Sequence, residues 1–189
     1  SVPLYPGQSK DTVHYVLEHS EAKVMFVGKH DSDKDVINSI PDGFPIIGFS
    51  YYSGKTDFDW NQLAGTEAPS GFKMEIADLD SLMTIVYTSG TTGKPKGAMH
   101  NFRSFAFSSK NGVDQIKTGP TDRALSFLPL AHVAERIIIE CQSFSAQITI
   151  ASAESLHSFG HYLATAIRPF SFAVPRFWAQ SQLAHSNTF

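Results

Sequence analysis

An apolar run leads directly into a loop of glycine, hydroxyl and lysine residues, and this combination limits the folds that the chain can adopt. Residues 82–86, Leu-Met-Thr-Ile-Val, are typical of a strand buried in a sheet. The next eleven residues, Tyr87 to Gly97, include three glycines, two lysines and four hydroxyl side chains besides the tyrosine. Glycines let backbone N–H groups approach a ligand, hydroxyls donate to oxygen, and ammonium groups neutralise charge. We therefore predict a polyphosphate-binding loop at the carboxyl edge of a sheet, where open α/β sheets bind their ligands.

Two common nucleotide-binding motifs are excluded by the spacing of this loop. A Walker loop has four residues between its first glycine and the Gly-Lys-Ser/Thr, whereas only two separate Gly90 from Gly93, and Pro95 follows Lys94. No Gly-x-Gly-x-x-Gly dinucleotide fingerprint is present. The plain alternative is a flexible surface turn. The preceding strand, the two lysines and the fixed proline argue against that alternative, because simple linkers seldom combine them.

A second segment, residues 128–136, reads Leu-Pro-Leu-Ala-His-Val-Ala-Glu-Arg. Residues 87–97 closely resemble the signature phosphate loop of the AMP-forming acyl- and aryl-adenylating enzymes. Residues 128–136 resemble the corresponding segment of long-chain fatty acyl-CoA synthetases. Weaker similarities to that subfamily lie at 2–6, 15–20 and 173–178. The resemblance therefore covers nearly the whole chain.

The resemblance implies a set of ATP-binding residues in the loop: Thr88, Ser89, Gly90, Thr91, Thr92, Gly93 and Lys96. Residues 89–93 would donate hydroxyl and backbone hydrogen bonds to the β- and γ-phosphates, and Lys96 would neutralise phosphate charge during catalysis. Thr88 corresponds to a family position near the Mg²⁺ ion and the phosphates. Lys94 occupies a position where the family accepts many residue types, so we expect it to be solvated.

His132 is the other candidate catalytic residue, and the resemblance places it beside the acyl carboxylate as a substrate-binding group. It follows Pro129 at the expected start of a helix, where free N–H groups and the helix dipole favour a nearby anion. The alternative is a histidine that only caps or packs. For Glu135 and Arg136 we expect a structural role in ion pairs or caps.

Alternating strand and helix patterns predict an α/β fold, with a mainly parallel sheet flanked by helices. Ser9 is expected to cap a helix with an apolar stripe of Val13, Val16 and Leu17. Residues 50–71 are expected to form a long connection, and residues 101–115 show both helical and irregular patterns. Further strands are predicted at 23–28, 45–49, 124–128, 147–151 and 170–174, and further helices at 31–40, 131–144 and 156–167.

The 189 residues are enough for one sizeable core, and the net charge of −3 gives no broad attraction to nucleic acid. Cys141 is the only cysteine, and no apolar stretch is long enough to span a bilayer. We therefore expect a cytoplasmic protein, or one peripheral at membranes. Later motifs of the resembled family and its small C-terminal domain are absent, so we expect residues 1–189 to be a single, partial N-terminal AMP-binding domain.

The resemblance implies a parent enzyme that uses ATP and Mg²⁺ to convert a long-chain fatty acid to acyl-AMP and then, with coenzyme A, to acyl-CoA. The 189 residues alone are expected to show no turnover. Two alternatives stay open at this point. One is a ligase for aryl or amino acids, and the other is a non-catalytic nucleotide-binding or scaffold fragment. The sequence does not indicate an oligomeric state.

Overall fold

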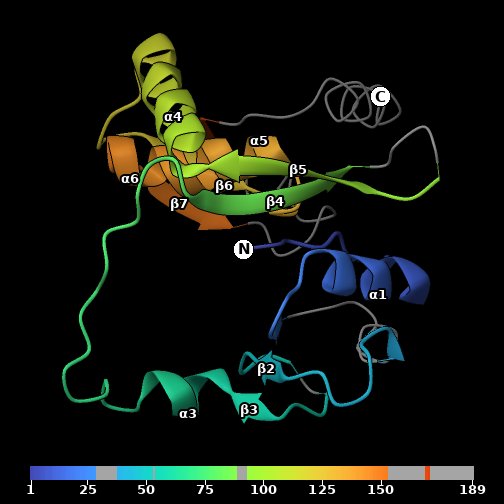
Figure 1. The fold of residues 1–189 in the computed structure, drawn as a ribbon. Coiled ribbons are helices and arrows are strands. Elements are labelled where there is room, and N and C mark those ends of the chain that lie inside the picture. The colour runs from blue at the N-terminus through green and yellow to red at the C-terminus, as the bar shows by residue number, and fades with distance from the viewer. Residues whose placement is uncertain (29–37, 53, 89–92, 153–168, 171–189) are drawn as a thin grey trace, which may run out of the picture. The chain divides into compact units, whose positions relative to one another are not determined.

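The computed structural model describes residues 1–28, 38–52, 54–88, 93–152 and 169–170. The chain has an α/β fold (Figure 1). It divides into two compact units. The first unit comprises residues 1–104 and 129–132, and the second comprises residues 105–128 and 133–189. The predicted single domain over residues 1–189 stays a prediction, because this division does not test it.

The first unit begins with helix α1, Lys10–His19, as the sequence predicts. Its N-cap is Ser9, whose hydroxyl accepts a hydrogen bond from the Thr12 backbone N–H at 3.3 Å. The predicted stripe of Val13, Val16 and Leu17 is buried. Val13 and Leu17 belong to a core cluster that includes Val27, Ile40 and Tyr52.

A small parallel sheet follows, with strand order β1-β2-β3. Its strands are β1 Met25–Val27, β2 Ile46–Gly48 and β3 Phe58–Asp59. The first two lie inside the predicted ranges but are shorter, and Phe26 is 49% exposed rather than buried. The expected long connection over 50–71 is wrong in part, because it contains β3 and helix α3, Trp60–Ala64. The N-cap of α3 is Asp59, whose side chain accepts a hydrogen bond from the Gln62 N–H at 3.0 Å.

An antiparallel hairpin carries the predicted phosphate loop. Strand β4, Leu82–Thr88, enters the loop, and strand β5, Lys96–Asn101, leaves it. The loop therefore follows the carboxyl end of a strand, as expected, but it joins antiparallel rather than parallel strands. The other edge of β4 is also paired, since the Ile85 N–H donates to the Ser1 carbonyl at 3.0 Å. The buried Thr84 hydroxyl donates to the same carbonyl at 2.9 Å.

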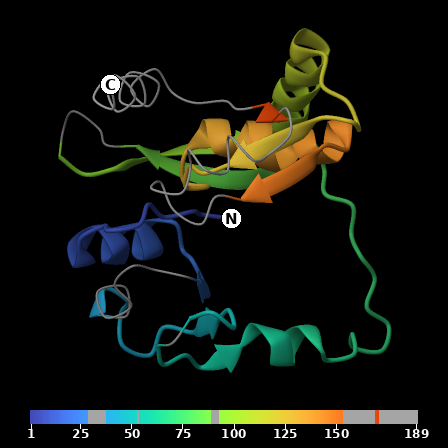
Figure 2. The ribbon, with the colours of Figure 1, turned by 180° about the vertical axis from the view of Figure 1, so that it is seen from behind.

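The second unit has a parallel sheet in which β6, Arg123–Ser126, lies between β7, Thr149–Ser152, and β8, Pro169–Phe170 (Figure 2). Helix α4, Phe102–Ile116, is continuous, although the sequence suggested an irregular stretch, and its first turn belongs to the first unit. Ala124, Ala146 and Ile148 form a buried cluster in the second unit.

The predicted helix over 131–144 is present in altered form. It begins two residues later and consists of α5, Val133–Glu135, the π-helix η1, Arg136–Cys141, and α6, Gln142–Ala146. The predicted helix at 156–167 and most of the predicted helix at 31–40 lie outside the described residues, as does most of the predicted strand at 170–174.

Candidate functional site

The predicted phosphate loop lies at the end of the β4–β5 hairpin where the two strands are connected. Thr88 is the last residue of β4, Lys96 is the first residue of β5, and the two are paired in the strand register. Directly opposed residues in an antiparallel pair point to the same face of the sheet. Both residues are exposed, so a hydroxyl and an ammonium group are presented together to solvent. Ser89, Gly90, Thr91 and Thr92 lie outside the described residues.

Two glycines of the motif satisfy different requirements of the hairpin. Gly93 has φ +99, in the region that side-chain-bearing residues rarely adopt, and a Cβ there would meet nothing within 4 Å. Gly97 pairs with Tyr87 across the strands. A Cβ on Gly97 would lie 2.7 Å from Ile85 Cγ2 and 3.2 Å from Tyr87 Cζ. Gly93 therefore allows the loop to turn, and Gly97 allows the two strands to pack closely.

Tyr87 is the next-to-last residue of β4, the strand that enters the loop and that we call its first stem. Contacts with helix α1 hold Tyr87 in place. Its side chain is buried, and its hydroxyl shares a 2.7 Å hydrogen bond with His19 Nδ1 of α1. Its ring also contacts Tyr15 and His19 edge-on, with centroid distances of 6.4 and 5.8 Å. Burial, with a further contribution from nearby Tyr15, raises the pKa of Tyr87 above its ordinary value. Tyr87 is therefore kept neutral and fixed in place.

Lys94 lies on the second stem, the segment that leads from the loop into β5, and its exposure agrees with the expectation that it is solvated. Its residue is exposed, but its Nζ atom lies 5.2 Å from the centroid of the Tyr15 ring. This distance is within the range of a cation–π interaction. Sequence reasoning missed the part played by Tyr15 and His19. The available signal was their four-residue spacing in a predicted helix, but nothing local linked that helix to the loop.

His132 lies in the turn directly before α5, not within a first helical turn as predicted. The residue is half-buried, and its backbone N–H donates to the Pro129 carbonyl at 2.8 Å. That bond closes a turn over residues 129–132, and this turn explains why the helix begins at Val133. The role of His132 beside a carboxylate stays a prediction.

Glu135 and Arg136 have the structural role that the sequence predicts. Glu135 is 2% exposed, and its Oε1 atom accepts hydrogen bonds from the Ser126 hydroxyl at 2.7 Å and the Phe127 N–H at 3.1 Å. Arg136 forms a 2.9 Å ion pair with Glu140 one turn along η1. Glu135 thus joins the end of β6 to α5.

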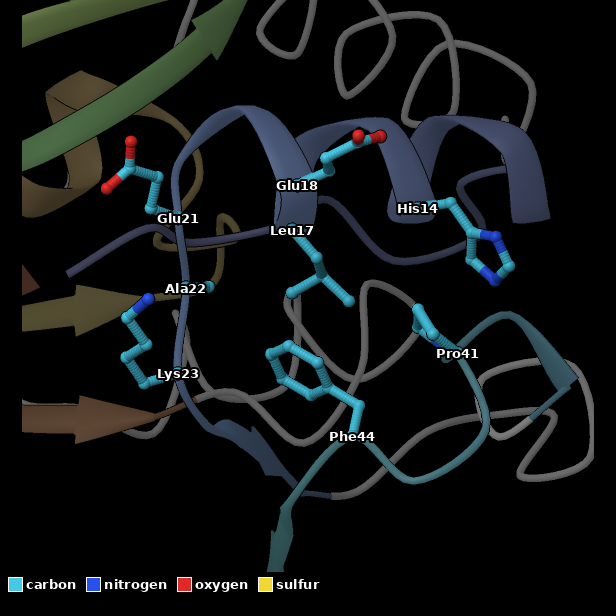
Figure 3. A pocket seen from close by; sticks show the side chains of 8 residues that line it. All are labelled: His14, Leu17, Glu18, Glu21, Ala22, Lys23, Pro41 and Phe44. Carbon is cyan, nitrogen blue, oxygen red and sulfur yellow. The ribbon is translucent and has the colours of Figure 1, made fainter.

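A cavity of about 470 Å³ lies elsewhere in the first unit, along α1 (Figure 3). Leu17 and Phe44 point toward one another within it, and His14 and Glu18 also line it. Thr88 and Lys96 do not line this cavity. It is therefore distinct from the predicted phosphate site.

The described residues provide neither a metal-binding cluster nor a reactive cysteine. No cluster of three or more His, Cys, Asp or Glu side chains suited to a metal ion occurs there. Cys141 is half-buried in η1, and burial, with a smaller contribution from Glu140, raises its pKa to about 11. Its thiol is therefore protonated at neutral pH, and it is a poor nucleophile there.

A family model described as "AMP-binding enzyme" matches residues 1–188. The chain belongs to this family. It is 33% identical to long-chain-fatty-acid–CoA ligase 1 of Homo sapiens over 164 residues, which cover 74% of this chain and 23% of the ligase. It is 31% identical to long-chain-fatty-acid–CoA ligase FadD15 of Mycobacterium tuberculosis over 191 residues, which cover 93% of this chain and 30% of the ligase.

Solved structures of adenylate-forming enzymes share the fold of this AMP-binding chain. The O-succinylbenzoate coenzyme A synthetase of Bacillus subtilis, solved with ATP and magnesium ion, superposes with a TM-score of 0.69 at 22% identity. The match covers 95% of this chain and 35% of the synthetase. The chain therefore spans about a quarter to a third of the length of the proteins that it matches.

Proposed function

We propose that the intact protein is an AMP-forming ligase that activates a long-chain fatty acid with ATP and transfers the acyl group to coenzyme A. The observation that carries this proposal is the Thr88–Lys96 pair at the loop end of the β4–β5 hairpin. Membership of the AMP-binding enzyme family supports it. The hydroxyl, the ammonium and the turn at Gly93 suit a polyphosphate, and the exposure of both side chains leaves them accessible to one.

The proposed first reaction is adenylation. A carboxylate oxygen of the acid attacks the α-phosphorus of ATP, and the bond to pyrophosphate breaks with its electron pair on the leaving oxygen. Negative charge therefore grows on the leaving phosphates, and groups placed beforehand around that charge lower the barrier. In this proposal Lys96 neutralises the pyrophosphate, and hydroxyl and N–H groups of residues 88–93 donate hydrogen bonds to it.

Thr88 is the residue that would help to hold Mg²⁺, since its exposed hydroxyl oxygen at the end of β4 is the kind of hard ligand this ion accepts. The bound ion would supply charge neutralisation across the phosphates. His132 is proposed to lie beside the acid's carboxylate and to orient it. In the second reaction the coenzyme A sulfur attacks the acyl carbon and its thiol proton is released to solvent. The bond between the acyl carbon and the phosphate oxygen then breaks with its electron pair on the oxygen, and AMP leaves.

The long-chain assignment follows the names of the curated relatives, which are long-chain-fatty-acid–CoA ligases. An aryl acid is the alternative, because a structural neighbour of similar fold is a synthetase for O-succinylbenzoate. A panel of saturated fatty acids and O-succinylbenzoate, each tested with the intact protein, ATP and coenzyme A, separates the two. Preference for the aryl acid would overturn the long-chain assignment.

Pyrophosphate exchange into ATP tests the adenylation step by itself. Lys96→Ala in the intact protein is expected to reduce the exchange rate by about 100- to 1,000-fold, as for the loss of a charge-stabilising group. It should affect transfer from preformed acyl-AMP to coenzyme A much less. Lys110→Ala is the matched control, because Lys110 is an exposed lysine on α4 outside the loop. Equal exchange in both variants would remove Lys96 from the mechanism.

A non-catalytic nucleotide-binding or scaffold role is the rival function. Calorimetric titration of the intact protein with ATP and Mg²⁺ separates the cases. Binding accompanied by exchange supports the ligase, binding without exchange supports a nucleotide-binding module, and no binding supports a scaffold.

In the part of the chain that the structure describes, no helix is both long and apolar enough to cross a bilayer. A cytoplasmic location, or a peripheral one at membranes, stays a prediction.

A further inference from the structure

Both described ends of the phosphate loop contact the same face of helix α1. Tyr15 and His19 are four residues apart on this helix, so their side chains are neighbours, and their ring centroids are 5.2 Å apart. Tyr87 on the first stem contacts both rings, and Lys94 on the second stem contacts Tyr15. We call these four residues the stem anchor.

The contact on the first stem combines a hydrogen bond with ring packing. The Tyr87 hydroxyl and His19 Nδ1 are 2.7 Å apart, although the residues are separated by 68 positions in the sequence. The Tyr87 ring is T-shaped to those of Tyr15 and His19, with interplanar angles of 84° and 78°. Edge-to-face geometry of this kind is favourable for aromatic rings. The direction of the Tyr87 side chain is therefore fixed by α1.

The contact on the second stem is a cation–π interaction between the Lys94 ammonium and the Tyr15 ring, at 5.2 Å from the centroid. Lys94 is exposed, so without Tyr15 its long side chain would sample many rotamers. Lys94 is two residues from Lys96, the proposed phosphate ligand. Restricting Lys94 therefore restricts the backbone that leads to Lys96.

The strand ladder alone does not require these contacts. Pairing of Val86, Tyr87 and Thr88 with Ala98, Gly97 and Lys96 already joins β4 to β5. The stem anchor instead acts on the residues next to the turn.

We infer that Tyr15 and His19 are positioning residues for ATP, which hold both ends of the loop in the phosphate-binding arrangement without contacting the nucleotide. This inference rests on the proposed function, and it predicts an effect on ATP affinity, because preorganisation reduces the entropy lost on binding.

The test measures the KM for ATP and the kcat of pyrophosphate exchange with the intact protein. Tyr15→Leu removes the ring, whereas Tyr15→Phe keeps it. Tyr15→Leu is expected to raise the KM for ATP by about two- to fivefold, the effect of losing one exposed cation–π contact, with kcat unchanged. Tyr15→Phe should retain the original KM. Tyr51→Leu is the matched control, since Tyr51 is 66% exposed and stacks on Phe49, away from the stem anchor.

A double substitution tests whether Tyr15 acts through Lys94. Lys94→Met is expected to raise the KM for ATP to the same extent as Tyr15→Leu. The double variant should be no worse than either single variant, because both remove one interaction. Additive increases would overturn the inference, since Lys94 would then act on the nucleotide independently of Tyr15.

A spectroscopic signal separates failure of this inference from failure of the proposed function. With lysines carrying ¹³C-methyl groups, the Lys94 resonance, assigned from Lys94→Arg, should be shifted upfield by the Tyr15 ring. The shift should persist in Tyr15→Phe and disappear in Tyr15→Leu. An absent shift, or a shift with equal KM values in all variants, overturns the positioning role alone. A protein with the shift but no ATP-dependent exchange overturns the proposed function and the positioning role with it.

Discussion

Gly97→Ala is the substitution whose effect on stability follows most directly from the structure, and the expected effect is a loss. The new Cβ would lie 2.7 Å from Ile85 Cγ2, whereas carbon atoms in good contact are about 3.5–4.0 Å apart, so a strand must move by roughly 1 Å. Overpacking of this kind costs about 1–3 kcal/mol. Replacing a glycine within a strand otherwise gains about 0.5–1 kcal/mol. We expect a net loss of about 1–2 kcal/mol of unfolding free energy.

Thermal unfolding of the intact protein measures this loss as a Tm decrease of about 2–8 °C. Gly119→Ala is the control, since a Cβ there meets nothing within 4 Å. Ile85→Ala removes Cγ2 and should relieve part of the penalty in the double variant, whereas Ile85→Val keeps a γ-methyl group and should not. The reasoning is refuted if Gly97→Ala is as stable as Gly119→Ala, or if its effect is simply additive with that of Ile85→Ala.

The remaining predictions concern two groups in the second unit. Glu135→Ala should lower the unfolding free energy by about 2–4 kcal/mol, because it removes the buried acceptor of the Ser126 hydroxyl and the Phe127 N–H. Calorimetry measures this loss, and it should show a much smaller change for the control Glu67→Ala at an exposed site. Burial raises the pKa of Cys141 to about 11 from an ordinary 9.0. Its alkylation by iodoacetamide at pH 8.5 should therefore be about 100-fold slower than in the urea-unfolded protein. Equal rates in the two states would contradict the raised pKa. The raised pKa also means that this thiol's contribution to stability is present below pH 9 and is lost as the pH rises through about 11, a loss that Cys141→Ala should abolish in pH-dependent unfolding.

The elements that could be predicted from the sequence are those determined by local patterns. Helix α1 has a capping serine and an apolar stripe, and both are observed. Strand β4 has a continuous apolar run, and its central residues Thr84, Val86 and Tyr87 are buried. Helix α3 also had a local signal, the cap Asp59, but the helix has only five residues and none is buried, so any apolar periodicity extends over little more than one turn.

The elements that could not be predicted depend on partners distant in the sequence. Strand β5 has no buried residue, so its own pattern does not identify it, and pairing with β4 forms it. The π-helical segment η1 has two buried residues, Arg136 and Ile138, and η1 is flanked by the fixed side chain of Glu135. Such a shift in helical register depends on tertiary packing, which helical periodicity does not record.

The candidate site shows the same division between local and distant information. Local composition predicts a polyphosphate-binding loop over residues 87–97, because phosphate binding requires particular residue types close together. The individual ATP-binding residues stay a prediction from the family resemblance. The stem anchor could not be identified this way, since the bond between His19 and Tyr87 spans 68 positions. A loop that binds and releases a polyphosphate needs stems that stay fixed while its ligand-binding residues remain accessible. The antiparallel hairpin and α1 supply fixed stems, and the exposure of Thr88 and Lys96 leaves the proposed ligand-binding residues accessible to solvent.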